Sequence, residues 1–197
     1  VTNDGKFLGF KNETIANLGA YARVFGTVTP TYLFGPCATG VYEIPAAYSN
    51  VKAVFTNTAP VDAYRGAGRP EATYTIERLE EKAAMALRMY KTEIRMKNFP
   101  TQFPFKQTLV HTVDSGDYVA GLEKAKQMAD YAGFEARRKK SEANGKLRGI
   151  GVSSYFEACG IAPSAAVMSL GCGVGLWESA EVRSVSYTHL TLPTTLQ

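Results

Sequence analysis

The feature that most constrains the fold is a strand-like segment joined to a helix-like segment through a connection that contains two glycines. Residues 51–55 are rich in apolar, β-branched and aromatic side chains, as strands are. Residues 71–90 repeat apolar side chains at helical spacing. These apolar side chains are Ile76, Leu79, Ala83 and Leu87. With the further strands and helices predicted below, this pattern indicates an α+β fold of mixed strands and long helices.

The opposite side of the 71–90 helix is expected to be polar. Glu80 and Glu81 lie close in sequence to Lys82 and Arg88. Charged residues at such short separations pair on an exposed helix surface. We therefore predict that both glutamates face away from the core.

The connection itself, residues 63–70, is called the glycine loop below. Gly66 and Gly68 lack a Cβ atom, so they permit positive φ and a close approach of a ligand to the backbone. Pro70 suits the first turn of the helix. Free N–H groups at the helix start, beside Arg65 and Arg69, would bind an anion or an oxo group. An ordinary strand–turn–helix connection also uses glycine, so the spacing leaves both interpretations open.

The N-terminal third of the chain is predicted to contain short strands. Residues 3–6 (Asn-Asp-Gly-Lys) are typical of a hairpin turn. The apolar pattern over residues 6–21 suggests paired strands with a break near residues 11–12. A short helix is expected at 91–97, followed by a proline-containing, extended connector over residues 98–114.

Asp117 is placed to cap a helix over residues 118–143. We expect its buried face to carry Leu122, Ala125, Met128 and Ala129. Residues 149–157 are predicted to form a buried strand. The glycine-rich residues 171–175 precede a further strand at 176–183.

Composition excludes several classes of function. The net charge is +4, and the basic residues 137–140 are more typical of a solvated helix end than of a nucleic-acid site. No apolar run reaches the ~20 residues that a membrane span requires. The three cysteines follow neither a zinc nor a disulfide pattern, which favours reduced thiols and a cytoplasmic location. His111 is expected to be a turn or packing residue.

Several segments resemble a known family, and they occur in the family's order. They are Ala16-Asn17-Leu18-Gly19-Ala20-Tyr21, Tyr42-Glu43-Ile44-Pro45, Ala63-Tyr64-Arg65-Gly66-Ala67-Gly68-Arg69, Glu93-Ile94-Arg95-Met96-Lys97-Asn98, Asp114-Ser115-Gly116-Asp117-Tyr118, and the stretch from Gly149-Ile150-Gly151 to Glu157-Ala158-Cys159-Gly160. Together they resemble the molybdenum hydroxylase large subunits, the family of xanthine dehydrogenase, aldehyde oxidoreductase and aerobic carbon monoxide dehydrogenase. The glycine loop resembles that of the form II carbon-monoxide-dehydrogenase-like members, and the similarity covers residues 1–183.

The resemblance implies that the glycine loop passes the molybdenum of a molybdenum–pterin cofactor. The implied cofactor-binding residues are Tyr64, Arg65, Gly66, Ala67, Gly68 and Arg69. No residue of the chain is implied to be catalytic or to bind metal directly, because the family's glutamate base is expected outside the chain.

The residues at positions 66 and 67 limit which metal and which substrate the resemblance implies. Copper-containing members resemble this loop but have a cysteine at the position of Gly66, because thiolate suits Cu(I). Xanthine-oxidising members have a phenylalanine at the position of Ala67. Without that thiol and that ring, the resemblance implies a copper-free enzyme that hydroxylates an aldehyde or N-heterocycle with water as the oxygen source.

The resemblance also implies a larger assembly. Residues 1–105 correspond to the end of a first cofactor-binding domain and residues 106–183 to the start of a second. We expect an FAD-binding medium subunit and a 2Fe-2S small subunit as partners, in a dimer of heterotrimers, with the isolated chain inactive. The alternative is a non-catalytic scaffold or assembly module of the same fold.

Residues 184–197 differ from the rest of the chain. Residues 185–194 contain no charged side chain, and their back-translation resembles a transposon-end adapter used in sequencing libraries. We therefore expect a non-native tail after Arg183 on an internal fragment of a longer subunit.

Overall fold

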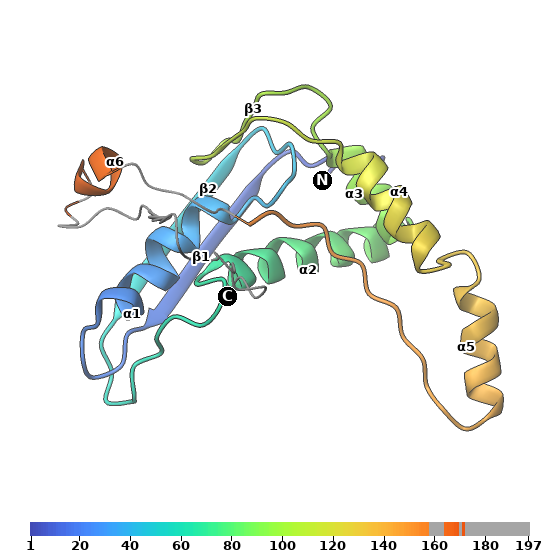
Figure 1. Ribbon diagram of the computed structural model, residues 1–197, viewed down its shortest axis with the longest axis horizontal. Helices are drawn as coiled ribbons and strands as arrows, with labels where there is room; N and C mark the ends of the chain where they lie inside the picture. The colour runs from blue at the N-terminus through green and yellow to red at the C-terminus, as the bar shows by residue number, and fades with distance from the viewer. Residues whose placement is uncertain (158–163, 170, 172–197) are drawn as a thin grey trace, which may run out of the picture. The chain divides into compact units, whose positions relative to one another are not determined.

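The computed structural model describes residues 1–157, 164–169 and 171 of the chain. The chain divides into two compact units, Val1–Glu157 and Ala158–Gln197. The described part of the second unit contains the short helix α6 (Ser164–Ser169) (Figure 1). The predicted strand at 176–183 and the predicted tail at 184–197 lie outside the described residues.

The first unit combines short strands with helices, which confirms the predicted α+β class. Its elements, in chain order, are β1 (Phe10–Asn17), α1 (Val24–Val28), the π-helical turn η1 (Thr29–Leu33), the 3-10 turn η2 (Gly35–Cys37), β2 (Ala47–Val54), α2 (Arg69–Leu87), α3 (Lys91–Asn98), β3 (Phe105–Lys106), β4 (Thr112–Val113), α4 (Tyr118–Met128) and α5 (Phe134–Ala143).

Strands β1 and β2 lie side by side and run parallel, with Phe10 opposite Ala47 and Asn17 opposite Val54 (Figure 1). The predicted pair of strands within residues 6–21 is therefore wrong, because this region forms the single strand β1. Parallel strands need a long crossover connection; here α1, η1 and η2 provide it. Residues 3–5 do form a turn, in which the Gly5 N–H donates to the Thr2 carbonyl at 3.0 Å, but strands do not flank it.

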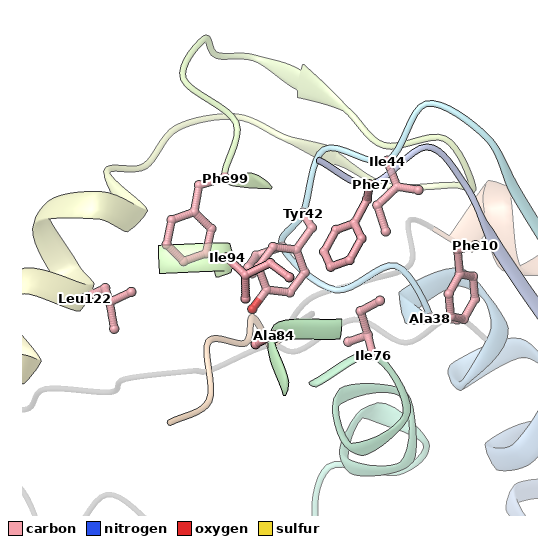
Figure 2. Close-up of a cluster of buried hydrophobic side chains, with 11 residues drawn as sticks. Phe7, Phe10, Ala38, Tyr42, Ile44, Ile76, Ala84, Ile94, Phe99 and Leu122 are labelled. Carbon is pink, nitrogen blue, oxygen red and sulfur yellow. The ribbon is translucent and has the colours of Figure 1, made fainter. Parts of the chain in front are cut away.

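The core gathers side chains from segments far apart in the sequence (Figure 2). The rings of Tyr42 and Phe99 stack with centroids 5.5 Å apart and an interplanar angle of 5°. Phe7 meets Tyr42 edge-on at 6.4 Å. Offset and edge-on ring contacts of this kind add to the stabilisation from burial. Phe99, which we predicted to lie in an extended connector, is thus part of the core.

Helix α2 starts and ends earlier than the predicted 71–90. Arg88 ends it in the left-handed conformation with φ +54°. Ile76 is buried as predicted, whereas Leu79 is 45% exposed. The prediction that Glu80 faces solvent is wrong, because its side chain is 0% exposed. The reason is Arg95 of α3, a buried cation that compensates carboxylates on this face of α2.

Asn98, the last residue of α3, anchors the N-terminal segment. Its Oδ1 accepts from the Phe7 N–H at 2.9 Å, and its Nδ2 donates to the carbonyls of Gly5 at 2.8 Å and Ile94 at 2.7 Å. All these groups are buried, so the amide satisfies polar atoms that water does not reach.

The helix predicted over residues 118–143 is two helices, α4 and α5. The Asp117 cap is confirmed, since its Oδ1 accepts from the Ala120 N–H at 2.9 Å. The helical conformation is interrupted between α4 and α5, where Asp130 has φ +45° and Arg137 donates to the carbonyl of Asp130 at 2.7 Å. Leu122 is buried, but Ala125, Met128 and Ala129 are exposed, so the predicted buried face is only partly correct.

Residues 149–157 run along α2 without forming a strand, so the predicted buried strand is wrong. Their side chains alternate between exposed and half-buried, because one side contacts the core and the other faces outward. Residues on both sides of position 105 pack together, as when Thr108 donates to the Ile44 carbonyl. The division at 105/106 stays a prediction. None of the helices in the described parts is long and apolar enough to cross a membrane.

Replacing Asn98 with alanine is expected to destabilise the chain by about 2–4 kcal/mol, because it leaves the Phe7 N–H and the Gly5 carbonyl buried without partners. Urea unfolding followed by circular dichroism measures the change. Asn144→Ala is the matched control. Asn144 is exposed, and among the described residues its side chain donates only to the Lys140 carbonyl, so its loss should cost less than about 0.5 kcal/mol. Equal costs for the two variants would contradict the anchoring role of Asn98.

Candidate functional site

The glycine loop turns sharply before α2. The Ala67 N–H donates to the Tyr64 carbonyl at 2.9 Å, and the Arg69 N–H donates to the Gly66 carbonyl at 3.0 Å. Gly66, Ala67 and Gly68 all have positive φ, at +95°, +32° and +86°. Three consecutive residues with positive φ are unusual, and glycine is the residue that tolerates this conformation. The backbone of the loop therefore has the conformation that its two glycines favour.

Gly68 is required by its surroundings as well as by its φ. A Cβ atom there would lie 2.5 Å from the Thr29 carbonyl oxygen and 2.8 Å from backbone atoms of Leu33 and Phe34. At Gly66, a Cβ would lie 2.8 Å from Cγ of Pro70. The loop thus packs backbone against backbone on η1, and this contact fixes where α2 begins.

The start of α2 offers hydrogen-bond donors. Within the described residues, the backbone N–H groups of Gly66 and Gly68 donate no hydrogen bond. The N-terminus of a helix carries partial positive charge, and its free N–H groups bind anions. The loop can therefore hold a negatively charged or oxo-bearing group through its backbone.

The two arginines of the loop differ in environment. Arg69 is buried; its Nη1 donates to the Ala67 carbonyl at 3.0 Å, and its Nε lies 3.7 Å from Oε1 of Glu157. Arg65 and Tyr64 are exposed. Arg69 therefore fixes the loop from behind, and Arg65 is the cation that is accessible from solvent.

The sequence predicted Tyr64, Arg65, Gly66, Ala67, Gly68 and Arg69 as cofactor-binding residues. The structure brings these six together in one turn, with exposure falling from Tyr64 to Arg69. Their role in binding a cofactor stays a prediction.

Sequence reasoning missed a contact beneath the loop between Cys37 and His111. The Cys37 Sγ lies 3.4 Å from the His111 Nε2, and the imidazole meets the Phe156 ring edge-on at 5.8 Å. Burial raises the pKa of the Cys37 thiol, and Arg69 opposes this only in part. Burial and then the charge of Arg69 lower the pKa of His111. No local motif could have revealed a pair that is 74 residues apart.

A cleft of about 510 Å³ runs along α2 from the glycine loop; we call it the α2 cleft. One wall is α2, with Arg69, Tyr74 and Glu77, and the other contains Val152, Tyr155 and Glu157. Among the residues that the structure describes, no three His, Cys, Asp or Glu side chains converge as metal ligands. The glycine loop itself offers a ligand its backbone and the exposed Arg65 side chain.

Comparison with known proteins identifies the family. Residues 1–99 match the model of the molybdopterin cofactor-binding domain. The chain belongs to the molybdenum hydroxylase large-subunit family. It is 40% identical over 190 residues to the carbon monoxide dehydrogenase large chain of Hydrogenophaga pseudoflava, an alignment that covers 92% of this chain and 23% of that protein. The chain thus spans less than a quarter of this relative.

Solved structures of the family have the same fold. Quinoline 2-oxidoreductase from Pseudomonas putida 86 superposes with a TM-score of 0.71 at 33% identity, covering 78% of this chain and 20% of that one. A Cu,Mo-CO dehydrogenase in its carbon monoxide reduced state gives a TM-score of 0.65 at 31% identity, covering 84% and 22%. The family resemblance and the fold class predicted from the sequence are therefore confirmed.

Gly68→Ala is expected to destabilise the chain by more than about 2 kcal/mol, because alanine is strained at positive φ and its Cβ meets backbone atoms. Gly121→Ala is the matched control. Gly121 lies within α4 with no atom within 4 Å of an added Cβ, so alanine should stabilise by about 0.5–1 kcal/mol. Thermal and urea unfolding measure both changes. A Gly68→Ala variant as stable as the parent would show that the loop does not pack as described.

Proposed function

We propose that this chain forms part of the catalytic, cofactor-binding subunit of a molybdenum hydroxylase that oxidises a small aldehyde or N-heterocycle with water as the oxygen source. The observation that carries the proposal is the glycine loop, a turn of three consecutive residues with positive φ directly before α2, inside a molybdopterin cofactor-binding domain.

The residues of the loop fit a molybdenum–pterin cofactor. Its phosphate and oxo groups are negatively polarised and suit N–H donors at a helix start. Gly66 and Ala67 are only half-buried, so a ligand can approach the backbone of the turn there, and Arg65 adds an exposed positive charge. When bound, the cofactor supplies the redox chemistry and the activated oxygen, while the protein supplies binding and orientation.

The chain's own residues position this site. Arg69 holds the Ala67 carbonyl through its Nη1, and the N–H of the half-buried Gly66 donates to no other backbone group among the described residues. Glu71 lies exposed in the first turn of α2, where a carboxylate is stabilised by the helix dipole. We assign it no part in catalysis. The base is expected to be a glutamate outside these residues.

The side chains of the loop favour a copper-free site. The related CO dehydrogenase contains copper as well as molybdenum. Gly66 offers no sulfur to a soft metal, and its φ of +95° with Pro70 alongside disfavours any side chain there. Ala67 presents only a methyl group, which cannot stack on a purine. A relative with high structural similarity is a quinoline oxidoreductase, which supports an N-heterocycle as substrate.

The proposal includes partners. Electrons must leave the site, so we propose an FAD-binding medium subunit and a 2Fe-2S small subunit, assembled as a dimer of heterotrimers in the cytoplasm. The chain described here, which spans less than a quarter of its curated relative, is expected to be inactive alone.

The assembled full-length complex tests the proposal. We expect molybdenum and pterin in equal amounts, no copper, and turnover of quinoline-like heterocycles or aldehydes but not of carbon monoxide, measured by elemental analysis and dye-coupled assays. Absence of molybdenum and pterin from matured complex would favour the scaffold alternative. Copper together with oxidation of carbon monoxide would contradict the proposed chemistry.

Arg65→Ala in the same complex is expected to lower pterin occupancy about tenfold or more, because a charged hydrogen bond to the cofactor is lost. Lys139→Ala, an exposed cation on α5, is the matched control and should leave occupancy unchanged. Equal pterin occupancy in both variants would show that Arg65 does not contribute to cofactor binding.

A further inference from the structure

A group of ionisable side chains lies buried between α2, α3 and residues 149–157, and the proposed function does not use it. We call Tyr42, Glu77, Glu80 and Arg95 the buried charge cluster. The side chains of Glu80 and Arg95 are both 0% exposed. Buried charges are costly unless they are fully paired, so this cluster needs a physical account.

Arg95 connects three parts of the molecule. Its Nε and Nη2 donate to Oε2 of Glu77 at 3.0 and 2.7 Å, which ties α3 to α2. Its Nη1 donates to the Lys91 carbonyl at 2.8 Å. Its Nη2 also donates to the Val152 carbonyl at 3.0 Å, and so holds residues 149–157 against α2. Val152 lines the α2 cleft, so Arg95 positions one wall of that cleft.

Glu80 has no such partners. Neither of its carboxyl oxygens has a hydrogen-bond partner among the described residues. The nearest cationic atom is the Arg95 Nε at 3.5 Å, whose proton points to Glu77. The Tyr42 hydroxyl donates to Glu77. One guanidinium therefore faces two buried carboxylates, and a single proton would balance the charge.

We propose that Glu80 holds this proton in the folded protein, and that loss of the proton to solvent releases residues 149–157 from α2, so that the buried charge cluster is a proton-operated latch on the wall of the α2 cleft. Ionised Glu80 would compete with Glu77 for Arg95, and it would require water that only an opened structure admits. If Arg95 releases the Val152 carbonyl, the guanidinium can turn towards Glu80, and water can reach the Glu80 carboxylate.

The groups that face Glu80 determine the direction of the pH effect. They are Glu77 on its own helix, Arg95 from α3 and Tyr42 from the segment after η2. Burial first, and then the charge of Glu77, raise the pKa of Glu80 to about 9, although Arg95 and the nearby Tyr42 hydroxyl both lower it. Burial likewise raises the pKa of Tyr42, so the phenol stays neutral in this range.

The two pKa values of Glu80 determine how opening depends on pH. In the opened structure Glu80 regains the ordinary pKa of a glutamate, near 4.5. Between that value and about 9, the closed state binds one more proton than the open state, so opening becomes more favourable as pH rises. The opening equilibrium constant should rise by up to about tenfold per pH unit in this window and level off above it.

Cys37 reports the opening directly. Its thiol is buried in a cluster with Phe34 and Ala72 against which Phe156 packs, so we expect it to be uncovered when residues 149–157 leave α2. Alkylation with iodoacetamide, followed by mass spectrometry of the peptide that contains Cys37, measures rare opening in the assembled full-length complex. The ratio of rates in wild type and Glu80→Gln removes the thiol's own pH dependence, because the glutamine side chain of this variant cannot ionise.

We expect this ratio to rise from pH 6 towards pH 9 by up to about tenfold per unit. Glu81→Gln is the matched control, since Glu81 pairs with Lys91 and Arg78 and not with the cluster. Its rate should follow the wild type at every pH. A wild-type to Glu80→Gln ratio that stays constant across this range would overturn the latch.

A second measurement applies if Glu80→Gln does not fold. The labelling rate of Cys37 in the wild type is then divided by that of an unstructured peptide with the same local sequence. This quotient is the opening equilibrium constant at each pH. A rise with pH supports the latch, and a constant value overturns it.

Discussion

Close backbone packing at Gly68 fixes the position of the glycine loop. Gly68 has φ +86° and no Cβ, so the backbone of residues 29–34 occupies the space that a side chain would fill. The loop therefore lies directly on these residues. Helix α2 begins at the next residue, so the direction of the helix and the position of its free N–H groups depend on this contact. A side chain at this position would move the start of α2 away from η1.

Two buried arginines extend this arrangement to residues 149–157. Arg69 lies near Glu157 at one end of the segment, and Arg95 holds the Val152 carbonyl nearer the other end. Each arginine also fixes a second element, since Arg69 binds the Ala67 carbonyl and Arg95 binds Glu77. The walls of the α2 cleft are thus set by buried cations, and this explains how a segment without strand pairing keeps a defined path.

Local signals in the sequence were sufficient for some elements. The glycine loop, the N-terminal region of α2, the helix at 91–97 and the Asp117 cap follow from glycine conformations, proline position, periodicity and a capping side chain, all of which act within a few residues. The family resemblance also came from short segments in order, and the comparisons confirm it.

The wrong predictions concern features that are determined by contacts between residues far apart in the sequence. Glu80 was predicted on the polar side because its neighbours in α2 are charged, and only Arg95 in another helix explains its burial. The partner of β1 is β2, which lies beyond a long crossover, whereas pairing within residues 6–21 was the local solution. The contact between Cys37 and His111 also joins distant segments. Such pairings depend on tertiary packing, which overrides local pattern.

The central claim is that the backbone of the glycine loop binds the molybdenum–pterin cofactor. An experimental structure of the assembled full-length complex with its cofactor tests this claim most directly. We predict that the Gly66 N–H lies within hydrogen-bonding distance, about 3 Å, of a cofactor oxygen or sulfur atom, with Gly68 still packed on η1. A cofactor bound elsewhere, with the glycine loop in contact only with protein or solvent, would contradict it.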